Sequence, residues 1–546
     1  MTTLIRTSCA PRVAAAIVAL ALFSFPALAS PVATQSGPVE GVAGDSVIAY
    51  KGLPYAAAPI GALRWRAPEP PQSWDDVRRA DRLAPACPQI GSYPEDSPAE
   101  PMSEDCLYLN LYVPEGARAD AKLPVMVWIY GGGLQNGSGS NPLYDGAALA
   151  RRGVIVVTFN YRLGALGFLA HADLSAETPR KISGNYGHLD QIAALQWVQD
   201  NIAAFGGDAD NVTVFGQSSG SISISALCAS PLAKGLFRRA IGESGGLFEP
   251  LDAAPEFKLA GAEEVGAAFA ARLGAASLDA LRAASVNEIL KARFYPQANI
   301  DGYFLDKTPY ETFARGEDCG ADILVGSNQD EGLYFIAGRD VTAATLTDEL
   351  NRDFPSFIVS LIGPMKADSD AAARDAFIRF ESDMRFAWNM RSWAQLNAKD
   401  GVRRTYFYRF AHTPPGEEGA SHGAEMRYVF DHLDLEAREW TEEDRALAQM
   451  IPAYWTNFAK TGDPNGAGLP EWPSFAAPGE QALLIGDEIR AGTIADTQTL
   501  DAIDRLYATV RFLLKYGYFI AGGLALMLFL LLANLATSLA RALRRR

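Results

Sequence analysis

Residues 211–228 (NVTVFGQSSGSISISALC) constrain the fold of this chain more than any other stretch. The β-branched and aromatic residues at 212–215 are typical of a short strand. Small residues then allow a sharp turn at Ser218, and the apolar positions after the turn predict a buried helix. A strand, a tight Gly-x-Ser-x-Gly turn and a helix together predict a nucleophile elbow, in which a serine is held on a strained turn at the edge of a sheet.

The Gly-x-Ser-x-Gly pattern occurs three times, and the context distinguishes the copies. Ser421 follows the Pro- and Gly-rich run 413–420, which is typical of a loop and supplies no strand. Ser244 follows a plausible strand, but residues 245–250 start no obvious helix. Only Ser218 has a strand before it and a helix after it, so we predict that Ser218 is the nucleophile.

The rest of the chain predicts an α/β fold. Residues 123–130 and 153–159 are near-continuous apolar runs, which indicate central strands covered on both faces. Residues 190–202 have helical spacing, and a further strand is expected at 322–326. Strands that alternate with helices favour a doubly wound, mostly parallel central sheet.

Three consecutive glycines, Gly131 to Gly133, directly follow the strand expected at 123–130. They therefore lie at the carboxyl edge of the sheet, where ligands bind in such folds. Because glycines have no side chains, their backbone N–H groups are uncovered and can point at a developing oxyanion. A phosphate-binding loop is the weaker interpretation, because no lysine followed by serine or threonine stands at the required spacing.

A serine nucleophile needs a base, and in this kind of fold the histidine follows the serine in the chain. His412, His422 and His432 meet that condition. The Gly- and Ser-rich loop 419–423 could bring His422 to the sheet edge, so the pattern favours His422. The other two are interpreted as surface or packing residues.

The acid of the triad is less constrained by the sequence. Glu331 comes just after the strand at 322–326, at a strand end. Asp330 is its immediate rival, and the residues alone leave the two open.

Composition excludes some partners. The chain has 546 residues and a formal net charge of −16, whereas nucleic-acid binding needs clustered Lys and Arg. We therefore expect no nucleic-acid partner. Nothing in the sequence calls for a metal or an organic cofactor, and the sequence indicates no oligomeric state.

The two ends of the chain predict export and membrane attachment. Residues 1–29 combine basic residues, an apolar core and an Ala-Leu-Ala end, which is typical of a secretory signal peptide. Residues 30–505 are then the catalytic domain and 506–515 a juxtamembrane linker. Residues 516–540 carry no charged side chain, and this length exceeds the roughly 20 residues that a membrane-spanning helix needs. The basic tail 541–546 predicts a cytoplasmic end, with the catalytic domain outside the cytoplasm, on the periplasmic face of the inner membrane if the source is bacterial.

Four cysteines remain after removal of the signal peptide: Cys87, Cys106, Cys228 and Cys319. They allow three full pairings, and disulfides are permissible outside the cytoplasm. The sequence does not decide whether Cys228 and Cys319 pair.

These residues together resemble the type-B carboxylesterase and cholinesterase family of α/β hydrolases. The most specific match is 103–110 (SEDCLYLN), which is similar to the second signature of that family. Residues 128–133 (WIYGGG), 161–164 (YRLG) and 454–465 (YWTNFAKTGDPN) add ordered matches over nearly all of 35–480.

The resemblance implies a serine esterase with an α/β-hydrolase fold and assigns roles that the residues left open. It implies the triad Ser218, Glu331 and His422, with Ser244 near the site as a supporting residue. The resemblance also implies oxyanion donors from backbone N–H groups, a disulfide and two structural ion pairs. The donors fall on Gly132, Gly133 and Ser219. The disulfide falls on Cys87–Cys106, and the ion pairs fall on Arg64–Glu104 and Arg162–Asp190.

This chain departs from the family beside the nucleophile. Gln217 stands where the family usually has Glu, and Ser219 where it usually has Ala. The loop between Cys87 and Cys106 has no tryptophan, so no cation–π platform for a choline is visible there. We therefore expect a small-molecule ester, small to medium and largely apolar, rather than a choline ester. Phe294 and Tyr295 are candidates for the acyl pocket, and aromatics of an exposed loop or of the core are the equal alternative.

Two alternatives differ in class. Some relatives of this fold are membrane-anchored adhesion modules that have lost the nucleophile, whereas Ser218, Glu331 and His422 are all present here. A lipase for longer acyl chains is the other alternative.

Overall fold

The computed structural model describes residues 27–91, 98, 101–364, 366–476, 479–494 and 497–543. Beyond Gly517 it describes the side chains of only Phe519, Met527 and Leu531. The predicted signal peptide lies outside the described residues except for 27–29, and the end of the predicted basic tail, 544–546, also lies outside them.

Twelve strands of the described chain form one sheet in the order β1-β4-β5-β7-β9-β8-β10-β11-β12-β13-β14-β15. Neighbours from β9 to β14 pair in parallel, and antiparallel pairs lie at the two ends. In chain order the strands are β1 (Ala27–Leu28), β4 (Val42–Gly44), β5 (Val47–Pro54), β7 (Tyr108–Pro114), β8 (Leu123–Ile129), β9 (Ile155–Phe159), β10 (Gly207–Gln217), β11 (Arg239–Glu243), β12 (Asp322–Asn328), β13 (Thr405–Phe410), β14 (Gln481–Ile485) and β15 (Ile489–Thr493).

A second, small sheet contains β2 (Val32–Ala33), β3 (Pro38–Glu40) and β6 (Arg78–Arg79). The α-helices are α1 (Ala147–Ala150), α2 (Gly164–Phe168), α3 (Ala172–Ala176), α4 (Tyr186–Asn201), α5 (Ser219–Ala229), α6 (Leu259–Arg272), α7 (Leu278–Ala283), α8 (Val286–Lys291), α9 (Pro309–Arg315), α10 (Leu333–Ile336), α11 (Leu346–Asn351), α12 (Ser356–Ile362), α13 (Asp370–Ser382), α14 (Trp388–Ala398), α15 (Met426–Val429), α16 (Glu442–Thr461) and α17 (Gln498–Leu543).

Helices cover both faces of the central strands, as their apolar sequences predict. Every residue of β9 is buried, and so are residues 125–129 of β8. Two consecutive residues of β11 show which helix covers each face of the sheet. Gly242 lies against Trp393 of α14, whereas Glu243 accepts a hydrogen bond from Trp455 of α16. Side chains alternate along a strand, so α14 and α16 pack on opposite faces of a doubly wound sheet.

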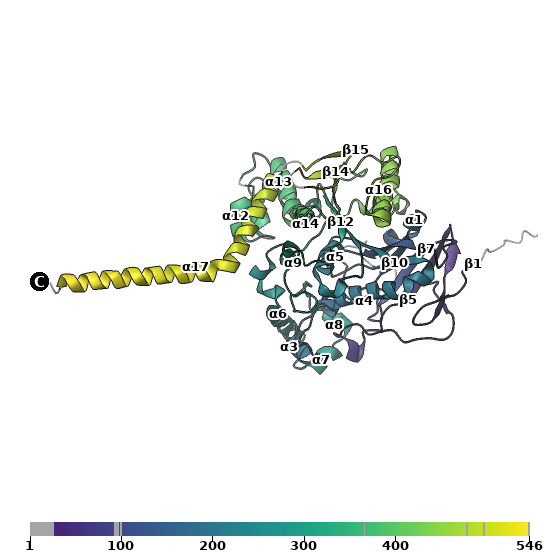
Figure 1. Ribbon diagram of the computed structural model, residues 1–546, viewed down its shortest axis with the longest axis horizontal. Helices are drawn as coiled ribbons and strands as arrows, with labels where there is room; N and C mark the ends of the chain where they lie inside the picture. Colours follow the sequence, from purple (N-terminus) through teal and green to yellow (C-terminus); the bar gives the residue numbers. More distant parts are fainter. Residues whose placement is uncertain are drawn as a thin grey trace, which may run out of the picture.

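The C-terminal helix α17 leaves the body of the protein and projects away from it (Figure 1). It contains both the segment predicted to be a linker, 506–515, and the segment predicted to span a membrane, 516–540. The range 506–515 is therefore helical and continuous with the charge-free segment. None of the helices in the described residues combines the length and the apolar character required of a bilayer-crossing segment; most side chains of 518–543 lie outside the described part.

Candidate active site

The strand, turn and helix predicted around Ser218 are confirmed. Strand β10 ends at Gln217, α5 begins at Ser219, and Ser218 between them has φ 57° and ψ −126°. A positive φ is strained for a serine, and neighbouring contacts hold it. A Cβ at Gly220 would lie 1.9 Å from the carbonyl oxygen of Ile129, so the turn fits against β8 only with glycine there. The elbow therefore presents Ser218 at the carboxyl end of the central parallel strands.

His422 and Glu331, predicted to be partners, are in contact. His422 Nδ1 lies 2.5 Å from Glu331 Oε2, and the other carboxylate oxygen of Glu331 accepts from the backbone N–H of Asn328 at 2.8 Å. Glu331 is fully buried. Asp330, its rival, accepts instead from the backbone N–H of Ala420 at 3.0 Å. The carboxylate that can orient the imidazole is therefore that of Glu331.

The other ring nitrogen of His422 faces the elbow. Its Nε2 lies 3.2 Å from the side-chain nitrogen of Gln217, the residue before Ser218. If the amide donates, Nε2 is the unprotonated nitrogen and Nδ1–H donates to Glu331. This is the tautomer that a general base needs. Among the described hydrogen bonds none joins Ser218 Oγ to His422, and catalytic hydrogen bonds are often loose without substrate.

Aromatic rings hold the imidazole in place, and sequence reasoning missed them. Phe386 stacks on the His422 ring with centroids 4.5 Å apart, and Tyr334 meets its edge at 5.7 Å. Phe386 lies in a π-helical turn, η8 (Asp383–Ala387), between α13 and α14. Such turns are frequent at functional sites, but a π-turn leaves no distinct pattern in one sequence. By its sequence, Phe386 is therefore indistinguishable from a core aromatic.

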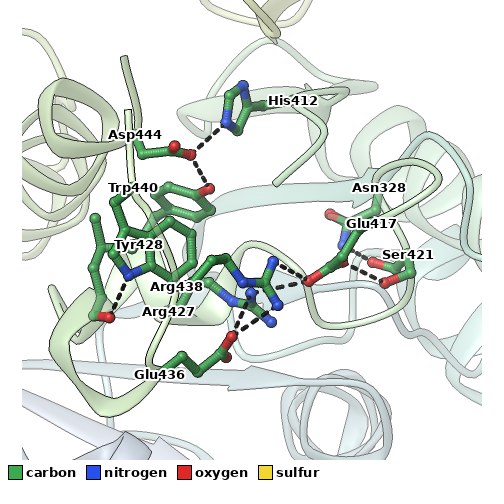
Figure 2. A network of polar contacts seen from close by, with 11 residues as sticks. Asn328, His412, Glu417, Ser421, Arg427, Tyr428, Glu436, Arg438, Trp440 and Asp444 are labelled. Carbon is green, nitrogen blue, oxygen red and sulfur yellow. Dashed lines mark hydrogen bonds and ion pairs between the residues drawn. The ribbon is translucent and has the colours of Figure 1, made fainter. Parts of the chain in front are cut away.

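The loop that carries His422 is fastened by a polar network (Figure 2). The side-chain N–H of Asn328 donates to the carbonyl oxygen of Ser421 at 2.7 Å. The hydroxyl of Ser421 lies 3.4 Å from Glu417, which itself accepts from Arg427 at 3.0 Å and from Arg438 at 2.8 Å. Ser421, the residue next to His422, is thus held through its carbonyl oxygen and through its hydroxyl.

The remaining histidines have other partners. His412 Nε2 lies 2.7 Å from Asp444 Oδ1, a pair that also appears in Figure 2. His432 Nε2 lies 2.9 Å from the carbonyl oxygen of Asp145. His188 is buried between two phenylalanine rings, and burial lowers its pKa to about 3. These contacts agree with the structural interpretation of His412 and His432.

The glycine loop after β8 lies beside the nucleophile. A Cβ at Gly131 would come within 3.0 Å of Ser218 Cβ, so the backbones approach closely. Gly132 and Gly133 have φ of 100° and 61°, and Leu134 continues with φ 59°. The N–H of Leu134 donates to Ser219 Oγ at 3.1 Å. The hydroxyl of Ser219 therefore ties the glycine loop to the first turn of α5.

Two more carboxyl groups are buried behind the site. Glu243 Oε1 accepts from Trp455 Nε1 at 2.7 Å, and Glu425 Oε2 accepts from Asn328 Nδ2 at 2.5 Å. Burial, and then the charge of Glu425, raises the pKa of Glu243 to about 8. Burial, and then the charge of Glu331, raises the pKa of Glu425 to about 7. Ser244 is also fully buried, and its hydroxyl has no hydrogen-bond partner among the described residues.

Two cavities are lined by residues that the sequence marks as candidates. One of about 360 Å³ is lined by Phe294 and Tyr295 together with Gln135, which follows the glycine loop closely in the chain. Another of about 950 Å³ includes Asp330 in its wall but none of Ser218, Glu331 and His422. Within the described ranges, no group of three or more His, Cys, Asp or Glu side chains is arranged to hold a metal ion.

The structural pairs implied by the family resemblance are present. Cys87 and Cys106 form a disulfide, whereas Cys228 and Cys319 are free thiols. Arg64 and Glu104 are 2.6 Å apart. Arg162 and Asp190 are 2.7 Å apart.

Comparison with known proteins agrees with this architecture. The sequence profile of the carboxylesterase family matches residues 29–502. A fumonisin B1 esterase from Sphingopyxis macrogoltabida is 39% identical over 478 residues, which cover 84% of this chain and 87% of that protein. A para-nitrobenzyl esterase from Bacillus subtilis (strain 168) is 38% identical over 488 residues, 84% of this chain and 95% of that protein.

Solved structures give the same result. A PNB esterase superimposes with a TM-score of 0.76 at 35% identity, covering 87% of this chain and 99% of the other. With the α/β-hydrolase fold and this coverage, the chain belongs to the carboxylesterase family and is a carboxylic ester hydrolase.

Proposed function

We propose that Ser218, His422 and Glu331 hydrolyse the ester through an acyl-serine intermediate. The observation that carries the proposal is the His422 ring, which has Glu331 on Nδ1 and faces the elbow with Nε2. His422 takes the proton of the Ser218 hydroxyl as the oxygen attacks the ester carbonyl. Glu331 holds the ring in the required tautomer and stabilises the imidazolium that forms.

The tetrahedral intermediate carries a negative oxygen that the backbone can stabilise. The N–H groups of Gly132, Gly133 and Ser219 are the proposed donors, and one such donor is worth on the order of 10² to 10³ in rate. The imidazolium then gives its proton to the leaving alcohol. Water attacks the acyl-serine with His422 again as base, which releases the acid and restores the hydroxyl.

The proposed substrates are small to medium, largely apolar esters. The cavity lined by Phe294 and Tyr295 supports this class, since it is partly apolar and lies beside the glycine loop. Gln217 replaces a carboxylate, which removes a charge that would favour a cationic substrate. The relative named para-nitrobenzyl esterase supports an uncharged aromatic ester as one member of this substrate class.

The test is turnover of p-nitrophenyl butyrate by the full chain in detergent. We expect Ser218→Ala to lower kcat by at least about 10³-fold, because the nucleophile is lost. Ser225→Ala is the matched control, since Ser225 lies in α5 and its hydroxyl donates to the carbonyl oxygen of Ile222 in the same helix; it should retain activity. Equal rates for the wild type and Ser218→Ala would favour an adhesion module instead, and a preference for emulsified over soluble esters would favour a lipase.

Membrane attachment is part of the same proposal. The charge-free segment 516–540, flanked by Lys515 and the basic residues after it, supports a single span with the catalytic domain outside the cytoplasm. The N-terminal signal-like segment supports export. Alkaline carbonate extraction of membranes tests the attachment: the full chain should stay in the pellet, and release into the supernatant would contradict it.

A further inference from the structure

The first part of α17 is packed on the catalytic domain and is not a flexible tether. Leu500, Ile503 and Tyr507 are buried at helical spacing. The ring of Tyr507 meets that of Trp388 edge-on at 4.7 Å. The helix therefore has a fixed direction where it leaves the domain.

Arg511 is the last strongly docked residue before the charge-free segment. Its guanidinium carbon lies 3.4 Å from the ring centroid of Tyr310, and its Nη2 donates to the carbonyl oxygen of Phe248. Tyr516 follows five residues later, which is about 7.5 Å along an α-helix. The surface of the domain around Arg511 is therefore held within a short distance of the apolar segment.

Large apolar side chains become exposed where the docking ends. Phe512 is 52% exposed, Leu513 54% and Phe519 79%. Lys515 lies 5.2 Å from the ring of Tyr516, a cation beside an aromatic ring, as is frequent at a membrane–water interface.

A second exposed apolar feature, α12, contacts α17. The α12 sequence is SFIVSLI, and of its apolar residues only Val359 is buried. Phe357 is 56% exposed and Leu361 67%, and they lie on one face because they are four residues apart. Figure 1 places α12 beside the point where α17 leaves the body.

We propose that α12 and the first exposed turns of α17 form one lipid-facing surface, made of Phe357, Leu361, Phe512, Leu513, Tyr516 and Phe519, that lies in the interfacial layer of a bilayer. The inference rests on the proposed membrane attachment through 516–540. An exposed apolar surface of this kind marks an interaction site. Lipid is the occupant that its continuity with the charge-free segment favours, since a helix that enters a bilayer brings its neighbour α12 to the same interface.

The consequence concerns the substrate. Helix α17 also contacts the π-turn η8, whose Phe386 stacks on His422. A domain seated on lipid through this surface holds the catalytic histidine close to the membrane, where esters that partition into lipid are concentrated.

The test is photocrosslinking of the full chain in phosphatidylcholine vesicles that contain a trace of phosphatidylcholine with a diazirine high on one acyl chain. After photolysis and proteolysis, mass spectrometry maps the adducts. We expect adducts within 351–363 as well as within 512–540. Phe357→Asp/Leu361→Asp should lower the yield at 351–363 by about tenfold, because two apolar side chains leave the lipid, while adducts within 512–540 persist.

Leu435→Asp is the matched control, since Leu435 is 48% exposed and belongs to the segment that leads into α16, a helix that Figure 1 shows on the opposite side of the domain from α12. Its adduct pattern should equal that of the wild type. Adducts confined to 512–540, or none at all, would overturn the inference, as would loss of the 351–363 adducts in favour of crosslinks between two copies of the chain. Hydrolysis of soluble p-nitrophenyl butyrate, measured in parallel, reports separately on the proposed catalytic residues.

Discussion

At the scale of single residues, the site depends on which side chains reach His422. The imidazole has a buried carboxylate on one nitrogen, a neutral amide on the other and an aromatic ring on its face. Gln217 contributes no charge, and the carboxylate in direct contact with the ring is that of Glu331.

Replacement of the acid tests this arrangement. Glu331→Gln should lower kcat by about 10³ to 10⁴-fold, because an amide can favour the wrong tautomer and cannot stabilise the imidazolium. Asp330→Asn is the control, since Asp330 contacts the backbone of Ala420 and not the ring; it should lose far less activity. Steady-state kinetics on p-nitrophenyl butyrate would decide, and a larger loss for Asp330→Asn would reverse the assignment.

At the scale of elements, the glycine loop and α5 are joined through Ser219. Its backbone N–H is a proposed oxyanion donor, and its hydroxyl accepts from Leu134, the residue after the other two donors. One side chain thus couples the positions of all three donors.

Ser219→Ala should therefore weaken catalysis without removing a donor. The N–H of Leu134 loses its acceptor, and a displaced loop should lower kcat by about tenfold, less than the loss of one whole donor. KM should change little, because the ground-state ester gains less from these N–H groups than the transition state does. Ser225→Ala, in the same helix and bonded among the described residues to Ile222, should be near wild type; equal kcat for the two variants would refute the coupling.

The same elements show how far the sequence predicts the structure. The strands at 123–130 and 153–159 and the elbow are predictable because hydrophobic pattern and turn chemistry are local. The choice between Asp330 and Glu331 is not possible from the residues alone, because consecutive carboxylates in a turn differ only in where the backbone points them. Phe386 escapes prediction because a π-turn has no sequence signature. The sequence of 506–515 predicts a linker rather than a docked helix because burial on another element is not a local property.

At the scale of the whole molecule, the core contains two carboxyl groups whose burial favours their protonated form. Glu243 and Glu425 are buried at the level of the central sheet, and their pKa values are raised to about 8 and about 7, first by burial. Their ordinary value is 4.5. The folded protein therefore retains protons that the unfolded chain releases at neutral pH.

This difference sets the sign of a stability change with pH. A raised folded-state pKa gives stability that is complete below the unfolded value, near pH 4.5, and is lost as the pH rises through about 7 to 8. The midpoint of thermal unfolding should therefore fall across this window. Glu243→Gln, which keeps an acceptor for Trp455, should flatten the fall by a few degrees. Parallel curves for both proteins between about pH 5 and pH 9 would contradict the role of Glu243.

The proposed mechanism is tested most directly by covalent labelling of the full chain with a fluorophosphonate and mass spectrometry of the modified peptide. We predict one adduct on Ser218, absent in Ser218→Ala and formed much more slowly in His422→Ala. An adduct on Ser244 or Ser421, or undiminished labelling of the Ser218→Ala protein, would contradict the assignment of Ser218 as the nucleophile.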